Sequence, residues 1–236
     1  MKIAIIHGIG HQGSTWHYAD LICQELGNLG PVEKSEFFLP RDMPHFCTGC
    51  YTCFYKGEES CPHIDSVKPI AEAMLAADLI ILTSPVYGMD VTGQMKAFLD
   101  HLCYMWMSHR PNPDMFNKIG LIVSTTAGAG LGPATKTMKN SMKFWGLKKI
   151  FVSSDTVAAM GWLDVSPEKK RKIQQKARTA ASRIHKSVRN IDRIRNPLFR
   201  TIFFQMMAGM EKKNDWNATD RSHWEEKGWL SGSRPF

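Results

Sequence analysis

The sequence predicts an α/β fold: a doubly wound, five-stranded parallel sheet of order 2-1-3-4-5, followed by a C-terminal helical and aromatic extension. Apolar, β-branched runs alternate five times with segments whose apolar residues recur at helical spacing, a pattern typical of right-handed βαβ units. Loops rich in glycine or proline follow three of these runs. The chain has 236 residues, of which 43% are hydrophobic, so it is long enough to bury one such core.

The opening segment predicts two strands and the helix between them. Residues 2–7 form an apolar run, so we expect a strand buried on both faces. Ser14 can cap the next helix, whose apolar residues keep helical spacing until Gly27. A more polar second strand is expected over 32–39 and stops at Pro40, which cannot continue a hydrogen-bonded ladder.

The middle of the chain begins with an irregular segment. Residues 40–63 show no hydrophobic periodicity, so we predict a loop there. A helix over 64–77 leads to a third strand over 78–84, and a long helix is expected over 91–107. The fourth strand is expected over 118–124, after a Pro-Asn-Pro turn.

One more strand and two helices complete the predicted main domain, residues 1–190. A helix over 131–145 precedes the fifth strand, 148–158, and Ser166-Pro167 starts the last long helix. Its narrow apolar stripe consists of Ile173, Ala177, Ala180, Ile184 and Val188. Residues 191–236 lie outside the alternating pattern and carry Phe199, Phe203, Phe204, Trp216, Trp224 and Trp229. We expect this extension to pack on the domain or on a partner subunit.

The formal charge of +8 is concentrated in one segment. Residues 136–200 hold 17 lysines and arginines against 4 acidic residues. No nucleic-acid-binding motif accompanies this charge, so we interpret it as a solvated helix face and expect no nucleic-acid partner. The sequence shows neither a bilayer-length apolar stretch nor a signal-peptide pattern, so we expect a cytoplasmic protein with no membrane partner.

Three loops follow strands whose carboxyl ends meet at one edge of the predicted sheet, where ligands of such folds bind. The first, residues 8–15, offers glycines, exposed N–H groups and two hydroxyls to a phosphate monoester. It lacks the lysine of a nucleoside-triphosphate loop, and no carboxylate closes the second strand to hold a dinucleotide ribose. The alternative is a glycine-rich turn without a ligand. His11 and Gly13 belong to this candidate phosphate loop.

The other two loops suit a flat ring. In residues 84–88, Pro85 and Gly88 favour an irregular turn, and Tyr87 offers a ring that can lie near a heterocycle. In residues 124–130, two glycines let the backbone pass close to a ring edge and donate N–H groups.

The segment TSPVYGMDVTGQMKAFLDH, residues 83–101, resembles the flavin-binding segment of the NADPH-dependent FMN reductases, and the similarity to this flavodoxin-like fold extends over about residues 1–190. The resemblance implies an FMN-binding domain. It implies phosphate contacts from Gln12, Ser14 and Thr15. It implies ring and ribityl contacts from Pro85, Val86, Tyr87, Gly88, Thr125, Thr126 and Gly128.

A cysteine cluster lies within the predicted loop 40–63. Its spacing is Cys47-x2-Cys50-x2-Cys53-x7-Cys61-Pro62, and thiolates two residues apart can surround one cubane cluster. The spacing also resembles the compact motif of iron–sulfur flavoproteins, which implies that these four cysteines hold a 4Fe-4S cluster. Two alternatives stay open, namely tetrahedral zinc on the same thiolates and cysteines that bind no metal.

The resemblance implies an FMN-dependent oxidoreductase that takes electrons from NAD(P)H and passes them to a quinone, a nitro or azo compound, a flavin or a protein. Because the flavin carries the chemistry, we expect no catalytic side chain. The alternatives are an iron–sulfur flavoprotein that carries electrons without its own NAD(P)H activity, and a binding module without enzymatic function. The aromatic extension and an exposed flavin edge lead us to expect a homodimer or homotetramer.

Overall fold

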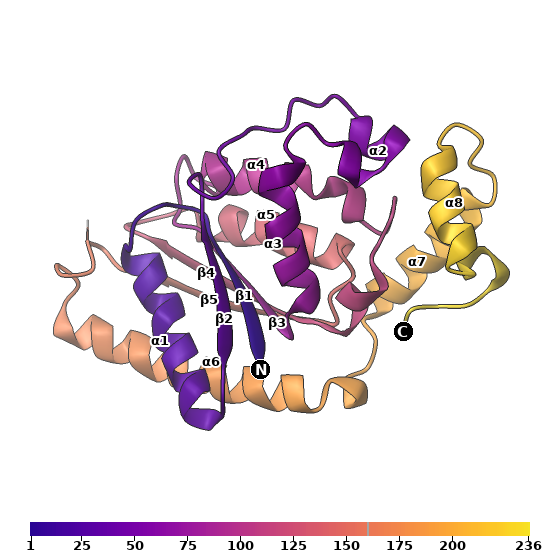
Figure 1. The fold of residues 1–236 in the computed structure, drawn as a ribbon. Coiled ribbons are helices and arrows are strands. Elements are labelled where there is room, and N and C mark those ends of the chain that lie inside the picture. Colours follow the sequence, from indigo (N-terminus) through magenta and orange to yellow (C-terminus); the bar gives the residue numbers. More distant parts are fainter. Residues whose placement is uncertain (160) are drawn as a thin grey trace.

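The computed structural model describes residues 1–159 and 161–236. Its centre is a sheet of five parallel strands in the order β2-β1-β3-β4-β5 (Figure 1), which confirms the predicted topology. The strands are β1 (Lys2–His7), β2 (Glu33–Phe38), β3 (Leu79–Thr83), β4 (Ile119–Thr126) and β5 (Lys149–Thr156). Every residue of β3 and β4 is buried, whereas the edge strand β2 is largely exposed.

Helices cover both faces of the sheet. Those on one face are α1 (Ser14–Leu29) and α6 (Pro167–Arg189), and those on the other are α3 (Ile64–Ala76), α4 (Gly93–His101) and α5 (Leu131–Phe144). Successive strand residues point to opposite faces. Ile3 and Ile5 of β1 therefore pack in the core under α1 and α6, and Ala4 and Ile6 pack in the core under α3, α4 and α5. The apolar run 2–7 thus supplies both layers.

The buried stripe of α6 differs from its prediction at two positions. Ile173, Ala177 and Ile184 are buried as expected, but Ala180 and Val188 are only partly buried. The buried residues beside them are Ala181 and Ser187. The stripe therefore shifts by one residue at two places along the helix.

The prediction of a loop over 40–63 is wrong for part of the segment. It contains α2 (Thr52–Lys56) and a 3-10 turn, Glu58–Ser60. Neither piece has a buried apolar stripe of its own, and Arg110 from a distant loop donates hydrogen bonds to the carbonyls of Cys53 and Phe54. A tertiary contact stabilises this helix, so periodicity did not reveal it.

The long helix expected over 91–107 is also shorter than predicted. α4 ends at His101 and a 3-10 turn, Cys103–Met105, follows. The indole N–H of Trp145 donates to the carbonyl of Leu102 at 3.2 Å. The Leu102 carbonyl therefore has a hydrogen-bond partner at the end of α5, and α4 does not need to continue to supply one.

The C-terminal extension forms a third, smaller core at the end of the sheet (Figure 1). It contains α7 (Leu198–Glu211) and α8 (Ala218–Glu226). Phe204, Trp224 and Trp229 pack against Met107 and Phe116 of the main domain. None of the described helices has the length and hydropathy needed to cross a bilayer.

Candidate functional site

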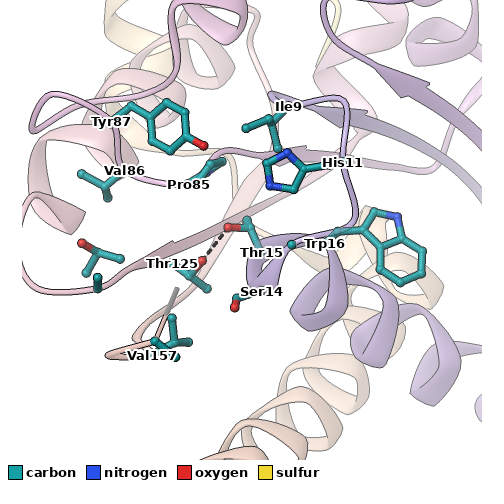
Figure 2. A pocket seen from close by; sticks show the side chains of 14 residues that line it. Ile9, His11, Ser14, Thr15, Trp16, Pro85, Val86, Tyr87, Thr125 and Val157 are labelled. Carbon is teal, nitrogen blue, oxygen red and sulfur yellow. Dashed lines mark hydrogen bonds between the residues drawn. The ribbon is translucent and has the colours of Figure 1, made fainter. Parts of the chain in front are cut away.

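The strongest candidate site is a pocket of about 220 Å³ at the carboxyl edge of the sheet. The loops after β1, β3 and β4 meet there because these strands are neighbours and parallel. Figure 2 shows Tyr87, Pro85 and His11 on one side of the pocket and Ser14, Thr15 and Thr125 on the other. The lining residues are Ile9, His11, Gly13, Ser14, Thr15, Trp16, Pro85, Val86, Tyr87, Thr125, Thr126, Ala127, Val157 and Ala159.

The first loop brings the start of α1 to the pocket. Gly13 is the residue before the helix, no side chain caps the helix there, and its first turn carries no acidic residue. The first N–H groups of a helix have no intrahelical partner and attract anions. The Thr15 hydroxyl lies 2.5 Å from the Thr125 hydroxyl, and both residues are buried. One hydroxyl of this pair donates to the other, so the site offers an anion the helix N–H donors and the one remaining hydroxyl proton.

Close packing fixes this loop against its neighbour. Gly8 accepts a hydrogen bond from the Thr92 hydroxyl at 2.5 Å, and its N–H donates to the Thr83 carbonyl at 2.7 Å. A β-carbon at Gly8 would lie 2.9 Å from both the Thr83 carbonyl oxygen and Thr92 Oγ1. Only glycine allows the loops after β1 and β3 to approach this closely.

The second loop is a tight turn that presents Tyr87 to solvent. Tyr87 and Asp90 exchange backbone hydrogen bonds of 2.9 and 3.0 Å, and Gly88 and Met89 between them both have positive φ, as in a type I′ turn. The Val86 N–H donates to the Thr125 carbonyl at 3.0 Å, which ties this loop to the end of β4. Tyr87 is 52% exposed, so its ring is free to lie against a ligand.

The pocket gathers nine of the twelve predicted cofactor-binding residues. These are His11, Gly13, Ser14, Thr15, Pro85, Val86, Tyr87, Thr125 and Thr126, while Gln12, Gly88 and Gly128 do not line it. Outside the three predicted loops, sequence reasoning missed the lining residues Trp16, Val157 and Ala159. Trp16 lies in the first turn of α1. Val157 and Ala159 follow the fifth strand, whose carboxyl end lies at the same edge of the sheet, so the strand order could have identified them.

Beside the site, burial controls the charge of His7. Its side chain is buried at the end of β1, and its Nδ1 lies 3.0 Å from the Thr83 hydroxyl. Burial, assisted by the charge of Lys34, lowers the pKa of His7 to about 4. The base of the first loop therefore holds a neutral imidazole near pH 7.

The predicted metal ligands occupy a second region, on the segment before α3. Cys47 and Cys50 are exposed, Cys53 and Cys61 are half-buried, and all four are free thiols. Burial, and then the neighbouring Cys61, Cys47 and Cys50, raise the pKa of Cys53 to about 11. The hydroxyl of Thr52 donates to the sulfur of Cys50 at 3.2 Å and lowers the pKa of that thiol.

This donor set fits a thiolate-bound metal centre. Four free thiols lie on one segment, and Cys53 interacts electrostatically with the other three. The ligands of a cubane bind different iron atoms, so they need not converge as closely as the ligands of a single ion. The other two cysteines differ, since Cys23 is a core residue whose burial raises its pKa to about 12, and Cys103 is half-buried on the turn after α4.

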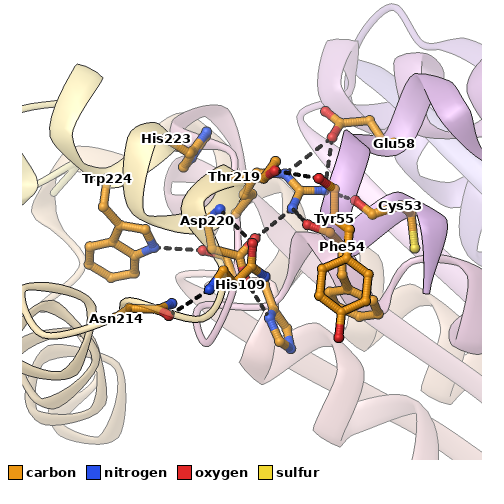
Figure 3. A network of polar contacts seen from close by, with 12 residues as sticks. Cys53, Phe54, Tyr55, Glu58, His109, Asn214, Thr219, Asp220, His223 and Trp224 are labelled. Carbon is orange, nitrogen blue, oxygen red and sulfur yellow. Dashed lines mark hydrogen bonds and ion pairs between the residues drawn. The ribbon is translucent and has the colours of Figure 1, made fainter.

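A polar network unseen in the sequence holds the cysteine segment in place (Figure 3). The guanidinium of Arg110 donates to the carbonyl of Cys53 and pairs with Glu58 at 3.1 Å and with Asp220 of α8 at 2.5 Å. His109 Nδ1 lies 2.8 Å from the second oxygen of Asp220. The C-terminal extension therefore holds α2 through Arg110 and also directly, because the Thr219 hydroxyl of α8 donates to the Tyr55 carbonyl at 2.7 Å.

With this geometry established, sequence comparisons identify similar proteins. The family described as NADPH-dependent FMN reductase matches residues 1–164. An iron–sulfur flavoprotein of Archaeoglobus fulgidus is 32% identical over 57% of this chain and 59% of its own length. An iron–sulfur flavoprotein of Methanosarcina thermophila is 26% identical over 66% of this chain and 78% of its length. An FMN-dependent NADH:quinone oxidoreductase of Burkholderia pseudomallei is 23% identical over 63% of this chain and 74% of its length.

The chain spans only 45% to 59% of the length of five of the similar iron–sulfur flavoproteins. Among solved structures, a flavone reductase has a TM-score of 0.60 at 16% identity and covers 84% of this chain and 66% of its own. An apo NADH:FMN oxidoreductase has a TM-score of 0.52 at 18% identity over 79% of this chain and 89% of its own. These likenesses concern the fold, and they agree with the flavodoxin-like architecture predicted from the sequence.

Proposed function

This chain belongs to the NADPH-dependent FMN reductase family, and from that premise we propose that it binds FMN in the pocket at the strand ends and oxidises NAD(P)H. Its electrons would pass to a quinone, a nitro or azo compound, a flavin or a protein acceptor. The observation that carries the proposal is the contact between the hydroxyls of Thr15 and Thr125, 2.5 Å apart. It joins the start of α1 to the end of β4 in one donor-rich pocket.

The phosphate end of the ligand belongs at the start of α1. The backbone N–H groups of Ser14 and Thr15 precede the first turn of hydrogen bonds, and the hydroxyl of Thr15 adds a donor. Charge-assisted hydrogen bonds of this kind hold a phosphate more firmly than neutral ones. Gln12 does not line the pocket, so Ser14 and Thr15 carry this role.

The ring end belongs beside the second loop. Pro85 and Val86 line the pocket and Tyr87 stands half in solvent, so a flat ring resting there keeps one face accessible. Bound FMN would supply hydride acceptance from NAD(P)H and electron release to an acceptor. The chain's part is to orient the ring and exclude water from one face, which requires no side-chain acid or base.

Reconstitution tests this function. Purified protein incubated with FMN and desalted should retain yellow flavin, and anaerobic addition of NADH or NADPH should bleach the flavin absorbance. Retained flavin that neither nucleotide reduces would favour an electron carrier. Protein that retains no flavin would favour a binding module.

A second function is favoured by the cysteine segment. We propose that Cys47, Cys50, Cys53 and Cys61 hold a 4Fe-4S cluster, which would exchange single electrons with the flavin site. Its support is the set of four free thiols braced by Arg110. Anaerobically purified protein should contain iron and acid-labile sulfide, Cys47→Ser should lose both, and the core control Cys23→Ala should keep both. Bound zinc without sulfide would support a zinc site on the same thiolates, and the absence of any metal would support cysteines that bind no metal.

We also propose that the chain forms a homodimer or homotetramer. The support is an exposed apolar face on α7, formed by Leu198, Ile202, Met206 and Met210. Light scattering coupled to gel filtration should show an oligomer that Ile202→Glu converts to monomer. A monomeric parent protein would contradict this proposal.

A further inference from the structure

A second set of metal-binding side chains lies where the cysteine segment meets α4. Cys61 and His63 lie just before the start of α3, and His101 is the last residue of α4. The ligand atoms of these three residues all lie within 4.8 Å of one another. His63 and His101 are 38 positions apart in the chain, so the fold brings these atoms together.

His101 has the environment of a metal ligand. It is 5% exposed, and its Nδ1 lies 2.8 Å from the carbonyl oxygen of Ala97. A carbonyl can only accept, so Nδ1 carries the proton and Nε2 keeps its lone pair. Metal-binding histidines are commonly oriented in this way, with the second nitrogen donating to a backbone carbonyl.

His63 faces that lone pair. Its Nδ1 lies 2.9 Å from Nε2 of His101, as a hydrogen bond when Nδ1 is protonated. If His63 carries its proton on Nε2 instead, both facing nitrogens have a free lone pair. Bonds of about 2.0–2.1 Å put two nitrogens on one tetrahedral ion about 3.3 Å apart, so a small opening of the pair admits an ion.

The chemistry of the three donor atoms restricts which metal ion can bind. One thiolate and two imidazoles suit zinc or ferrous iron, whereas magnesium and calcium prefer oxygen ligands. Three protein ligands also leave a position open for water. The ring of His45 stacks on His63 with centroids 4.5 Å apart, which covers one face of that ligand.

We propose that Cys61, His63 and His101 bind one divalent zinc or ferrous ion, and that this site competes with the 4Fe-4S cluster for Cys61. Binding releases the proton of the Cys61 thiol to solvent. The mononuclear site uses one of the four cysteines assigned to the cluster, so the two metal states of the segment exclude each other. The inference is independent of the FMN proposal.

Cobalt(II) titration of metal-free, reduced protein tests the site without needing a cluster. Cys47 and Cys50 are exposed, so the Cys47→Ser/Cys50→Ser double variant should fold, cannot complete a four-thiolate cluster, and should still bind one cobalt with a thiolate charge-transfer band. Adding His101→Gln to that variant should weaken binding at least about tenfold. The control His17→Gln on α1 should not. Circular dichroism verifies the fold of each variant.

Two results would overturn the proposal. One is a folded double variant that binds no cobalt. The other is equal cobalt affinity with and without His101. Competition has its own readout: one equivalent of zinc should lower iron–sulfur reconstitution in the parent protein and lower it less in His101→Gln. Equal inhibition in the parent protein and in His101→Gln would refute the competition. The existence of the mononuclear site is tested separately by the cobalt titration.

Discussion

Arg110 and Asp220 form a buried ion pair, with Nη1 2.5 Å from Oδ1, that joins α8 to the cysteine segment. Arg110 is 6% exposed and Asp220 1% exposed. The same guanidinium donates to the Cys53 carbonyl. The extension and the candidate metal site are therefore mechanically linked.

Asp220→Asn should destabilise the protein by about 3 kcal/mol, because it leaves the buried Arg110 charge with the half-exposed Glu58 as its one remaining carboxylate partner. Urea unfolding measures this loss. Hydrogen exchange should also accelerate in α2 more than in α1. The control Asp215→Asn removes a carboxylate that is 91% exposed and should leave the unfolding midpoint unchanged. Equal effects of the two substitutions would contradict a stabilising role of the Arg110–Asp220 ion pair.

Gly8→Ala should destabilise the chain by roughly 1–3 kcal/mol, since the new β-carbon would meet two oxygens at 2.9 Å. Displacement of the loop should also weaken FMN binding. Gly27→Ala places its β-carbon where no atom lies within 4 Å and serves as the control. Thermal unfolding compares them, and a Gly8→Ala protein as stable as its control would contradict the close packing.

Thr15→Val should weaken FMN binding about 10- to 100-fold, because it removes a hydrogen bond to a charged phosphate. Riboflavin, which lacks that phosphate, should bind the variant nearly as well as it binds the parent protein. Flavin fluorescence titration gives both affinities. Thr179→Val on α6 is the control. A proportional loss of FMN and riboflavin affinity would place the phosphate elsewhere.

His7 should make stability depend on pH between about 6.5 and 4. The unfolded chain takes up its proton near the ordinary pKa of 6.5, whereas the buried ring resists until about pH 4. Stability therefore falls as the pH is lowered through this window, by about 3 kcal/mol in total. Urea unfolding of His7→Gln should show a correspondingly flatter pH profile. Parallel profiles for the two proteins would contradict a neutral buried His7.

Local sequence rules recovered the parts of the molecule that local physics controls. Apolar runs such as 2–7 located the strands, and glycines such as Gly8 and Gly13 marked the loop that meets the pocket. The chain order of the strands and the rule that ligands bind at their carboxyl ends then brought the three loops together.

Contacts between distant segments were beyond those rules. Arg110 and Asp220 are 110 positions apart, and neither belongs to a periodic pattern or a motif. The helix α2 depends on that arginine rather than on its own apolar face. His101 reads as an ordinary helix residue until the fold places its Nε2 beside His63.

The central claim is that the strand-end pocket holds FMN, and a crystal structure of the protein grown with FMN tests it most directly. We predict density for the phosphate against the start of α1, beside Ser14 and Thr15, and for the ring beside Tyr87. A pocket that stays empty at saturating FMN, or flavin density at another surface, would contradict the claim.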